Sequence, residues 1–239
     1  MVVEVCATNF QSALNAQDAG ADRIELCSEL AVGGITPNYG LLKKVTSVLN
    51  IPIHVLIRPR SGDFTYSDSD FEVMKQNIAL CKRLKCSGIV SGVLHKDMKV
   101  DMARTKELID LASPLTFTFH RAFDWTPDPI ATAKKLAEIG VARILTSGQA
   151  TSAIEGLPML TKLKETFTGT ILAAGGINPE NAAQFKAQAF EEIHLSATAQ
   201  EKTIDTPKIS LNSTKHFDET KQSVSSLIIL QQLISQLNA

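Results

Sequence analysis

The sequence predicts an α/β fold in which eight strand–helix units close into one barrel, and three observations carry this prediction. Short runs rich in β-branched and apolar residues alternate with longer segments of helical period through most of the 239 residues. Such strict alternation implies right-handed parallel crossovers. The first strand is not followed by the Gly-x-Gly-x-x-Gly turn that is usual in an open doubly wound sheet. We therefore expect a TIM-type (β/α)8 barrel, with residues 1–239 as a single domain.

The strands are expected where the short apolar runs lie. Their ranges are 2–6, 22–27, 53–58, 88–93, 115–120, 142–147, 170–174 and 191–196. Each of the first seven is followed by a helical segment, and these lie at 9–19, 38–49, 68–84, 101–112, 128–138, 152–165 and 179–187. Ser67, Asp128 and Asn178 precede favourable first-turn residues, as helix caps do.

Residues 197–239 depart from the alternating pattern. Residues 200–220 are polar, and we expect an irregular surface excursion there. Leu227, Leu230, Ile234 and Leu237 then mark one face of a final helix, which we expect to close the outer layer of the barrel. A helix that binds a partner is the alternative.

Composition and charge exclude several classes of protein. With 24 basic against 25 acidic side chains and a net charge of -1, the chain has no large positive field for a nucleic-acid partner. Neither a secretory signal nor an apolar run long enough to span a membrane is recognisable. We expect a cytoplasmic protein with four reduced cysteines, no organic cofactor and no structural need for a metal.

The strands carry polar residues on one of their two faces. Because side chains alternate across a strand and the helices need the apolar set, the polar set is expected in the barrel lumen. Its members are Glu4, Arg23, Glu25, His54, Arg58, His120, Arg143 and His194. Near the strand starts, these groups can be structural salt bridges, whereas near the carboxyl ends a functional site is favoured.

The loops after the strands carry further candidates. Arg58 and Arg60 flank a turn, His120, Arg121 and Asp124 lie within five residues, and such clusters bind anions and transfer protons. Ser147, Gly175 and Gly176 follow the sixth and seventh strands, where barrels often bind phosphate. Solvated loop charges and a tight turn without a ligand are the alternatives.

Two of the four cysteines share a place in the predicted barrel. Cys6 and Cys27 end the adjacent first and second strands with the inward parity, so their sulfurs can approach one ion. Two thiolates suit Cu(I), and His194 or another lumen group can complete the set. The alternative is a pair of buried, unreactive thiols. Cys81 and Cys86 instead fit the packing of the third helix against the fourth strand.

The same stretches resemble the CutC family, named for copper homeostasis. They are Glu4-Val5-Cys6, Gly20-Ala21-Asp22-Arg23-Ile24-Glu25-Leu26-Cys27, Gly33-Gly34-Ile35-Thr36-Pro37, Ile57-Arg58-Pro59-Arg60-Ser61-Gly62-Asp63-Phe64, Thr118-Phe119-His120-Arg121-Ala122-Phe123-Asp124 and Ile144-Leu145-Thr146-Ser147-Gly148. The resemblance covers roughly residues 2–200 and implies a TIM-type barrel, a cytoplasmic location, a homodimer or higher homo-oligomer, and an association with copper. The family's proposed copper cysteines correspond to Cys6 and Cys27. One departure is Thr198, where the family tends to have arginine at this rim.

Two functions follow as hypotheses. The first is a copper homeostasis protein that binds Cu(I) through Cys6 and Cys27. The second is an enzyme that acts on a small anionic or phosphorylated metabolite at the mouth of the barrel. In the second, Arg58, Arg60, Arg121, Ser147, Gly175 and Gly176 are candidates for substrate binding, and Glu25, His120 and Asp124 are candidates for catalysis. A Schiff-base aldolase is disfavoured because no lysine lies at an inward strand end.

Overall fold

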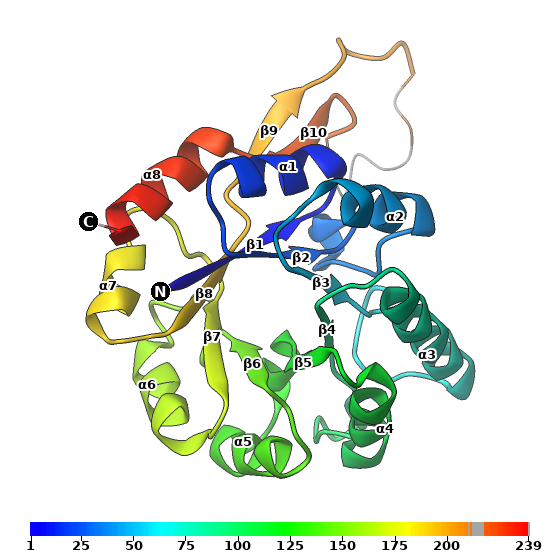
Figure 1. Ribbon diagram of the computed structural model, residues 1–239, viewed down its shortest axis with the longest axis vertical. Helices are drawn as coiled ribbons and strands as arrows, with labels where there is room; N and C mark the ends of the chain where they lie inside the picture. The colour runs from blue at the N-terminus through cyan, green and yellow to red at the C-terminus, as the bar shows by residue number, and fades with distance from the viewer. Residues whose placement is uncertain (210, 212–217, 239) are drawn as a thin grey trace.

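A computed structural model describes residues 1–209, 211 and 218–238, and it has the predicted closed barrel of eight parallel strands in sequential order. Figure 1 shows the strands as an inner ring with the helices outside it. The barrel strands are β1 (Val2–Ala7), β2 (Arg23–Leu26), β3 (Ile53–Leu56), β4 (Gly88–Ser91), β5 (Thr116–Phe119), β6 (Arg143–Thr146), β7 (Thr170–Ala174) and β8 (Glu192–Leu195). β1 pairs with both β2 and β8, which closes the ring.

The outer layer consists of the helices that follow the strands. They are α1 (Phe10–Asp18), α2 (Tyr39–Val48), α3 (Asp68–Arg83), α4 (Met102–Ala112), α5 (Pro129–Glu138), α6 (Leu157–Thr166), α7 (Ala182–Ala187) and α8 (Leu227–Asn238). Two 3-10 turns, η1 (Leu30–Val32) and η2 (Arg121–Trp125), lie in the loops after β2 and β5. Ser67 and Asp128 cap α3 and α5 as predicted, each accepting a hydrogen bond from a backbone N–H of the first turn.

Two helices begin later than predicted. α6 begins at Leu157 rather than at residue 152, because a turn around the Gly156 backbone comes first and lies directly against Ser147. α7 begins at Ala182 rather than at residue 179. The Asn178 side chain accepts N–H bonds from Glu180 and Asn181, which forms a turn and not a helix cap.

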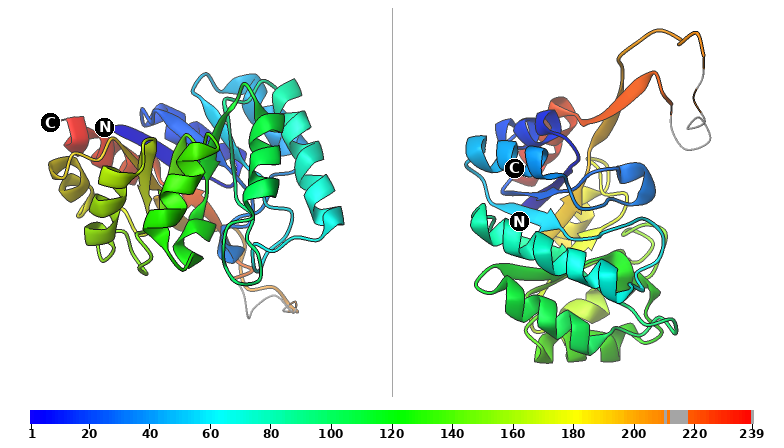
Figure 2. Two further views of the ribbon diagram at one scale, coloured as in Figure 1. Left: turned by 90° about the horizontal axis from the view of Figure 1, so that it is seen from below. Right: turned by 90° about the vertical axis from the view of Figure 1, so that its right-hand side faces the viewer.

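The segment after β8 is more regular than predicted. β9 (Thr198–Lys202) pairs antiparallel with β10 (Lys221–Ser225), and this two-stranded arm projects from the barrel (Figures 1 and 2). Part of the expected excursion, at residues 210 and 212–217, lies outside the described residues. α8 lies between α7 and α1 in the ring of helices (Figure 1). Its buried residues are Leu230, Leu233 and Leu237, so its apolar face is rotated slightly from the predicted one.

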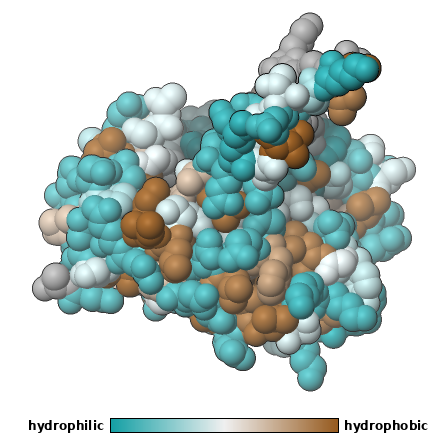
Figure 3. Space-filling model, turned by 90° about the horizontal axis from the view of Figure 1, so that it is seen from above, coloured by the Kyte–Doolittle hydropathy of each residue, from teal (hydrophilic) through white to brown (hydrophobic). Residues whose placement is uncertain are grey.

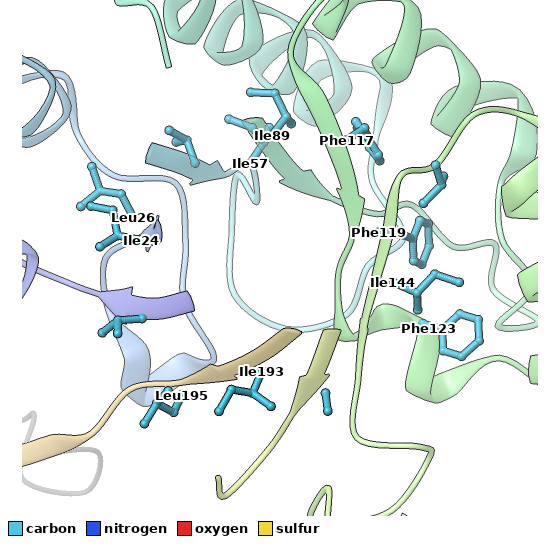
Figure 4. Close-up of a cluster of buried hydrophobic side chains, with 14 of the residues drawn as sticks. Ile24, Leu26, Ile57, Ile89, Phe117, Phe119, Phe123, Ile144, Ile193 and Leu195 are labelled. Atoms are coloured by element: carbon cyan, nitrogen blue, oxygen red, sulfur yellow. The ribbon is translucent and has the colours of Figure 1, made fainter. Parts of the chain in front are cut away.

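The main hydrophobic core lies between the strands and the helices. Its largest fully buried side chains include Phe119, Phe123, Phe185, Ile24 and Leu26. Figure 4 shows members of this core arranged around the outside of the strand ring. Cys81 and Cys86 belong to it, in agreement with the packing interpretation of that pair. Because the main apolar set of the strands faces the helices, the lumen receives the opposite set, which is largely polar but includes Leu56, Leu145 and Leu172.

The outer surface mixes residue types. In the face seen in Figure 3, hydrophobic residues form separate patches among hydrophilic ones. Within the part of the chain that the structure describes, no helix has the length and apolar character needed to cross a bilayer.

Candidate functional site

A network of buried ion pairs fills the lumen near the amino-terminal ends of the strands. Arg23 donates to Glu4 and, at 2.5 Å, to Glu192, and Arg143 Nε lies 2.9 Å from the same Glu192 carboxylate. Burial opposes ionisation of Glu4, but its hydrogen bond to His194 and the charges of His194 and Arg23 outweigh burial and lower its pKa to about 2. The buried salt bridges that the sequence allowed as one interpretation of these residues are therefore present.

The next layer toward the mouth holds an acid, a base and a thiol in contact. Ligand atoms of Cys6, Glu25 and His194 all lie within 4.8 Å of one another. His194 Nδ1 lies 2.8 Å from Glu4 Oε1 and 3.5 Å from Glu25 Oε2. Burial raises the pKa of Glu25 to about 7, although the charge of His194 opposes this rise. Burial opposes protonation of His194, but its hydrogen bonds with Cys6 and Glu4 and the charge of Glu25 raise its pKa well above the usual value.

The two predicted metal ligands lie beside each other. Cys6 Sγ and Cys27 Sγ are 3.5 Å apart, and both residues are buried as free thiols. The hydrogen bond with Cys27 and then burial raise the pKa of the Cys6 thiol well above its usual value. An ion roughly 2.3 Å from each sulfur, the usual Zn–S length, would see the two sulfurs at an angle of about 100°. That angle suits a three- or four-coordinate ion, whereas a linear one requires sulfurs about 4.6 Å apart.

A cavity of about 830 Å³ opens above these layers, at the carboxyl ends of the strands. Residues of the predicted site that line it are Cys6, Glu25, Cys27, Arg58, His120, Arg121, Asp124, Gly175, Gly176 and His194. The predicted convergence of thiols and ionisable groups at this end of the barrel is therefore present in the structure. The volume lies in the range of small-molecule pockets and far exceeds that of one ion.

Arg58 is buried and holds two loops together. Its guanidinium donates to the carbonyls of Val32 and Gly34, at 2.7 and 2.8 Å, and to the Gly62 carbonyl at 2.6 Å. Arg60 points elsewhere: it bonds to Asp63 and the Thr65 carbonyl and is absent from the cavity lining. The structure therefore brings Arg58 to the candidate site and leaves Arg60 at the surface.

Asp124 joins the loops after β5 and β6. Its carboxylate accepts hydrogen bonds from Arg121 Nε at 2.8 Å and from the Ser147 hydroxyl at 3.1 Å, and it also accepts from Thr146 and the Gln149 backbone. Arg121 Nη2 in turn donates to the Ser147 hydroxyl at 2.8 Å. The Asp124 carboxylate is thus held in place by several donors.

Gly175 and Gly176 adopt positive φ angles of +109° and +72° at the rim. A Cβ at Gly175 would lie 3.2 Å from the Ser147 side chain and 3.7 Å from Arg121 Nη1, so the backbone passes close to both groups. The glycine turn, Arg121 and Ser147 therefore meet on one side of the mouth, but Ser147 is fully buried and does not line the cavity.

The aromatic wall of the cavity was not predicted from the sequence. Phe64 and Trp125 both line it, with ring centroids 4.9 Å apart. Both follow strands in the predicted site loops, and large aromatic residues in such loops were the available signal.

Comparisons with known proteins agree with this architecture. A family model described as the CutC family matches residues 1–199. A CutC family protein of Proteus mirabilis is 45% identical over 199 residues, which are 83% of this chain and 80% of the relative. The solved CutC structure from Streptococcus agalactiae, provisionally described as a copper homeostasis protein, is 30% identical with a TM-score of 0.77. That alignment covers 81% of this chain and 97% of the other.

More distant structures share only the fold. Thiamine phosphate pyrophosphorylase from Pyrococcus furiosus aligns over 99% of this chain and 95% of its own, at 12% identity and a TM-score of 0.57. The barrel architecture is thus common to proteins of unrelated sequence, and function has to be argued from the site.

Proposed function

Because the chain belongs to the CutC family, a family linked to copper homeostasis, we propose that it binds Cu(I) through Cys6 and Cys27. The observation that carries the proposal is the 3.5 Å separation of the two sulfurs beside His194 and Glu25. Two soft thiolates and an imidazole are ligands that Cu(I) accepts, whereas Mg²⁺ and Ca²⁺ prefer oxygen ligands. The donor set therefore fits the ion that the family name suggests.

Each group has a distinct part in this proposal. Cys6 and Cys27 supply the thiolates, and His194 or Glu25 completes the coordination, in keeping with the bent S–metal–S angle. Since each thiol has to lose its proton to bind as a thiolate, copper uptake releases protons, and the affinity rises with pH. Copper bound here is cargo to be held and transferred.

Anaerobic titration of Cu(I) against a competing chelator tests the proposal. We expect one ion per chain for the wild-type protein, and a loss of at least tenfold in affinity for Cys6→Ser and for Cys27→Ser. Cys86→Ser is the matched control, because it removes a buried thiol from the core on the far side of the strands. Unchanged affinity and stoichiometry in the Cys6→Ser, Cys27→Ser double variant would exclude this pair as ligands.

We also propose a cytoplasmic location and a homodimer, on the grounds of the reduced cysteines and the family resemblance. Cell fractionation and sedimentation equilibrium test these two points. A monomer at micromolar concentration would contradict the second.

The alternative function, an enzyme acting on a small anionic metabolite, is favoured by one observation. The cavity is large enough for an organic molecule, and Glu25, His120, Arg121 and Asp124 line it. In this proposal Glu25 or His120 moves a proton, Asp124 orients its neighbours and Arg121 meets the anion at the rim. Incubation with carboxylated and phosphorylated metabolites, followed by NMR of the products, tests it, and no conversion of any of them would count against an enzyme.

A further inference from the structure

His120 presents a hydrogen-bond donor that has no acceptor. Its Nδ1 accepts the backbone N–H of Ala122 at 3.3 Å, which assigns the proton of the neutral ring to Nε2. Among the described residues Nε2 has no hydrogen-bond partner, although His120 is only 4% exposed and lines the cavity. Burial and the charge of Arg58 lower the pKa of His120 to about 3, so the ring is neutral at physiological pH. A buried N–H without an acceptor lowers the stability of the folded protein, so its presence in a cavity wall indicates a ligand that accepts the hydrogen bond.

Arg58 adds a buried charge that no protein anion neutralises. The residue is 5% exposed, and its guanidinium donates hydrogen bonds to the backbone carbonyls of Val32, Gly34 and Gly62. In the described ranges it forms no ion pair with a carboxylate, unlike Arg23 and Arg143 deeper in the lumen. Buried cations are ordinarily paired, so this end of the cavity favours an anion.

An aromatic wall stands beside these two groups. The centroid of the Phe64 ring lies 4.7 Å from the His120 ring centroid and 4.9 Å from the Trp125 ring centroid. The Arg58 guanidinium lies 5.0 Å from the same Phe64 centroid. Trp125 is 47% exposed, which is unusual for a tryptophan unless it contacts a partner or ligand. We call Arg58, Phe64, His120 and Trp125 the aromatic corner. It offers an apolar surface next to a hydrogen-bond donor and a positive charge.

We propose that the aromatic corner binds a small organic anion whose carboxylate or phosphate oxygen accepts the His120 Nε2 proton. The charge of the anion balances Arg58, and its apolar part packs against Phe64 and Trp125. This inference rests on the second proposed function, because it assumes that an organic molecule occupies the cavity. The molecule is then an organic anion with an apolar part. Its binding requires neither bound copper nor conversion of the anion to a product.

Binding to the copper-free protein is the test, with benzoate and phenyl phosphate as probes. Both carry an anionic oxygen on a flat apolar ring, while benzamide matches benzoate in shape without its charge. Proton-detected ¹⁵N spectra of histidine-labelled protein report on His120 Nε2 directly, and calorimetry gives the affinities. We expect at least one of the two anions to bind, to shift the Nε2 resonance, and to bind at least tenfold more tightly than benzamide does.

Variants of His120 separate the contribution of its N–H donor from that of the shape of its ring. His120→Phe keeps a ring but removes the N–H, and we expect about tenfold weaker binding because a hydrogen bond to a charged acceptor is lost. His120→Gln retains a side-chain N–H donor and should bind within a few-fold of the wild type. His95→Phe, which removes a side chain that is 57% exposed and outside the cavity lining, should bind as the wild type does.

Three results would overturn the inference. They are no binding of either anion at millimolar concentration, equal affinity for benzamide and benzoate, and full affinity in His120→Phe with an unmoved Nε2 resonance. Binding of either anion without conversion of any metabolite would support the aromatic corner while the enzymatic proposal fails. The two proposals therefore fail on different measurements.

Discussion

Acid should destabilise this protein through His120, and the structure sets the size of the effect. The folded-state pKa is about 3, against an ordinary value of 6.5, because the ring is buried and near Arg58. The unfolded chain therefore binds a proton that the folded chain does not, and stability falls as the pH drops through 6.5. The loss approaches about 1.4 kcal/mol per pH unit and continues to about pH 3. At about pH 5 the single histidine costs about 2 kcal/mol.

Urea unfolding of the wild type and His120→Gln, each at about pH 7.5 and about pH 5, measures this cost. His54 contributes in the same direction, since burial lowers its pKa to about 4, but its effect is common to both proteins. We expect the acid-induced loss in free energy of unfolding to be about 2 kcal/mol smaller in His120→Gln. Equal losses in the wild type and His120→Gln would refute the burial argument, and with it the neutral donor on which the aromatic corner depends.

Two further predictions concern stability. Glu192→Gln should lose about 3–5 kcal/mol in urea unfolding, because a buried carboxylate that serves two guanidinium groups is removed, whereas Glu107→Gln in an exposed pair should lose under about 1 kcal/mol. Gly148→Ala should be much more destabilising than Gly140→Ala. Both glycines have positive φ angles. A Cβ at Gly148 would lie 2.4 Å from the Gly156 carbonyl oxygen, whereas a Cβ at Gly140 would meet nothing within 4 Å. Similar melting temperatures of the two variants would contradict this prediction.

The barrel and the direction of its polar side chains followed from the sequence because both depend on local pattern. Strand alternation alone placed Glu4, Glu25 and His120 in the lumen, and all three are buried there. The same pattern could not tell that Arg60 turns away from the cavity. That outcome depends on where its guanidinium finds acceptors, and Asp63 and the Thr65 carbonyl are nearer partners within its own loop.

The elements that the sequence did not predict depend on contacts between distant segments. The β9–β10 arm pairs residues 19 to 27 positions apart across a polar stretch without strong alternation. The delayed start of α6 depends on Gly156 lying against Ser147. Nothing in the local sequence around either residue predicts this contact. The aromatic wall likewise needs two loops, after β3 and β5, to meet above the lumen.

The ion-pair layer explains why the proposed copper site is ordered before any ion binds. Arg23 links Glu4 to Glu192, so the Glu4 carboxylate is fixed by groups on neighbouring strands. Glu4 in turn holds His194 Nδ1 at 2.8 Å, which fixes the orientation of the imidazole ring. The thiols and the imidazole thus sit on a rigid charged base, whereas the aromatic corner above them is built from loops. An ion would meet side chains already held in place that still have to release their protons, and an organic anion would meet a wall whose Trp125 side chain is exposed.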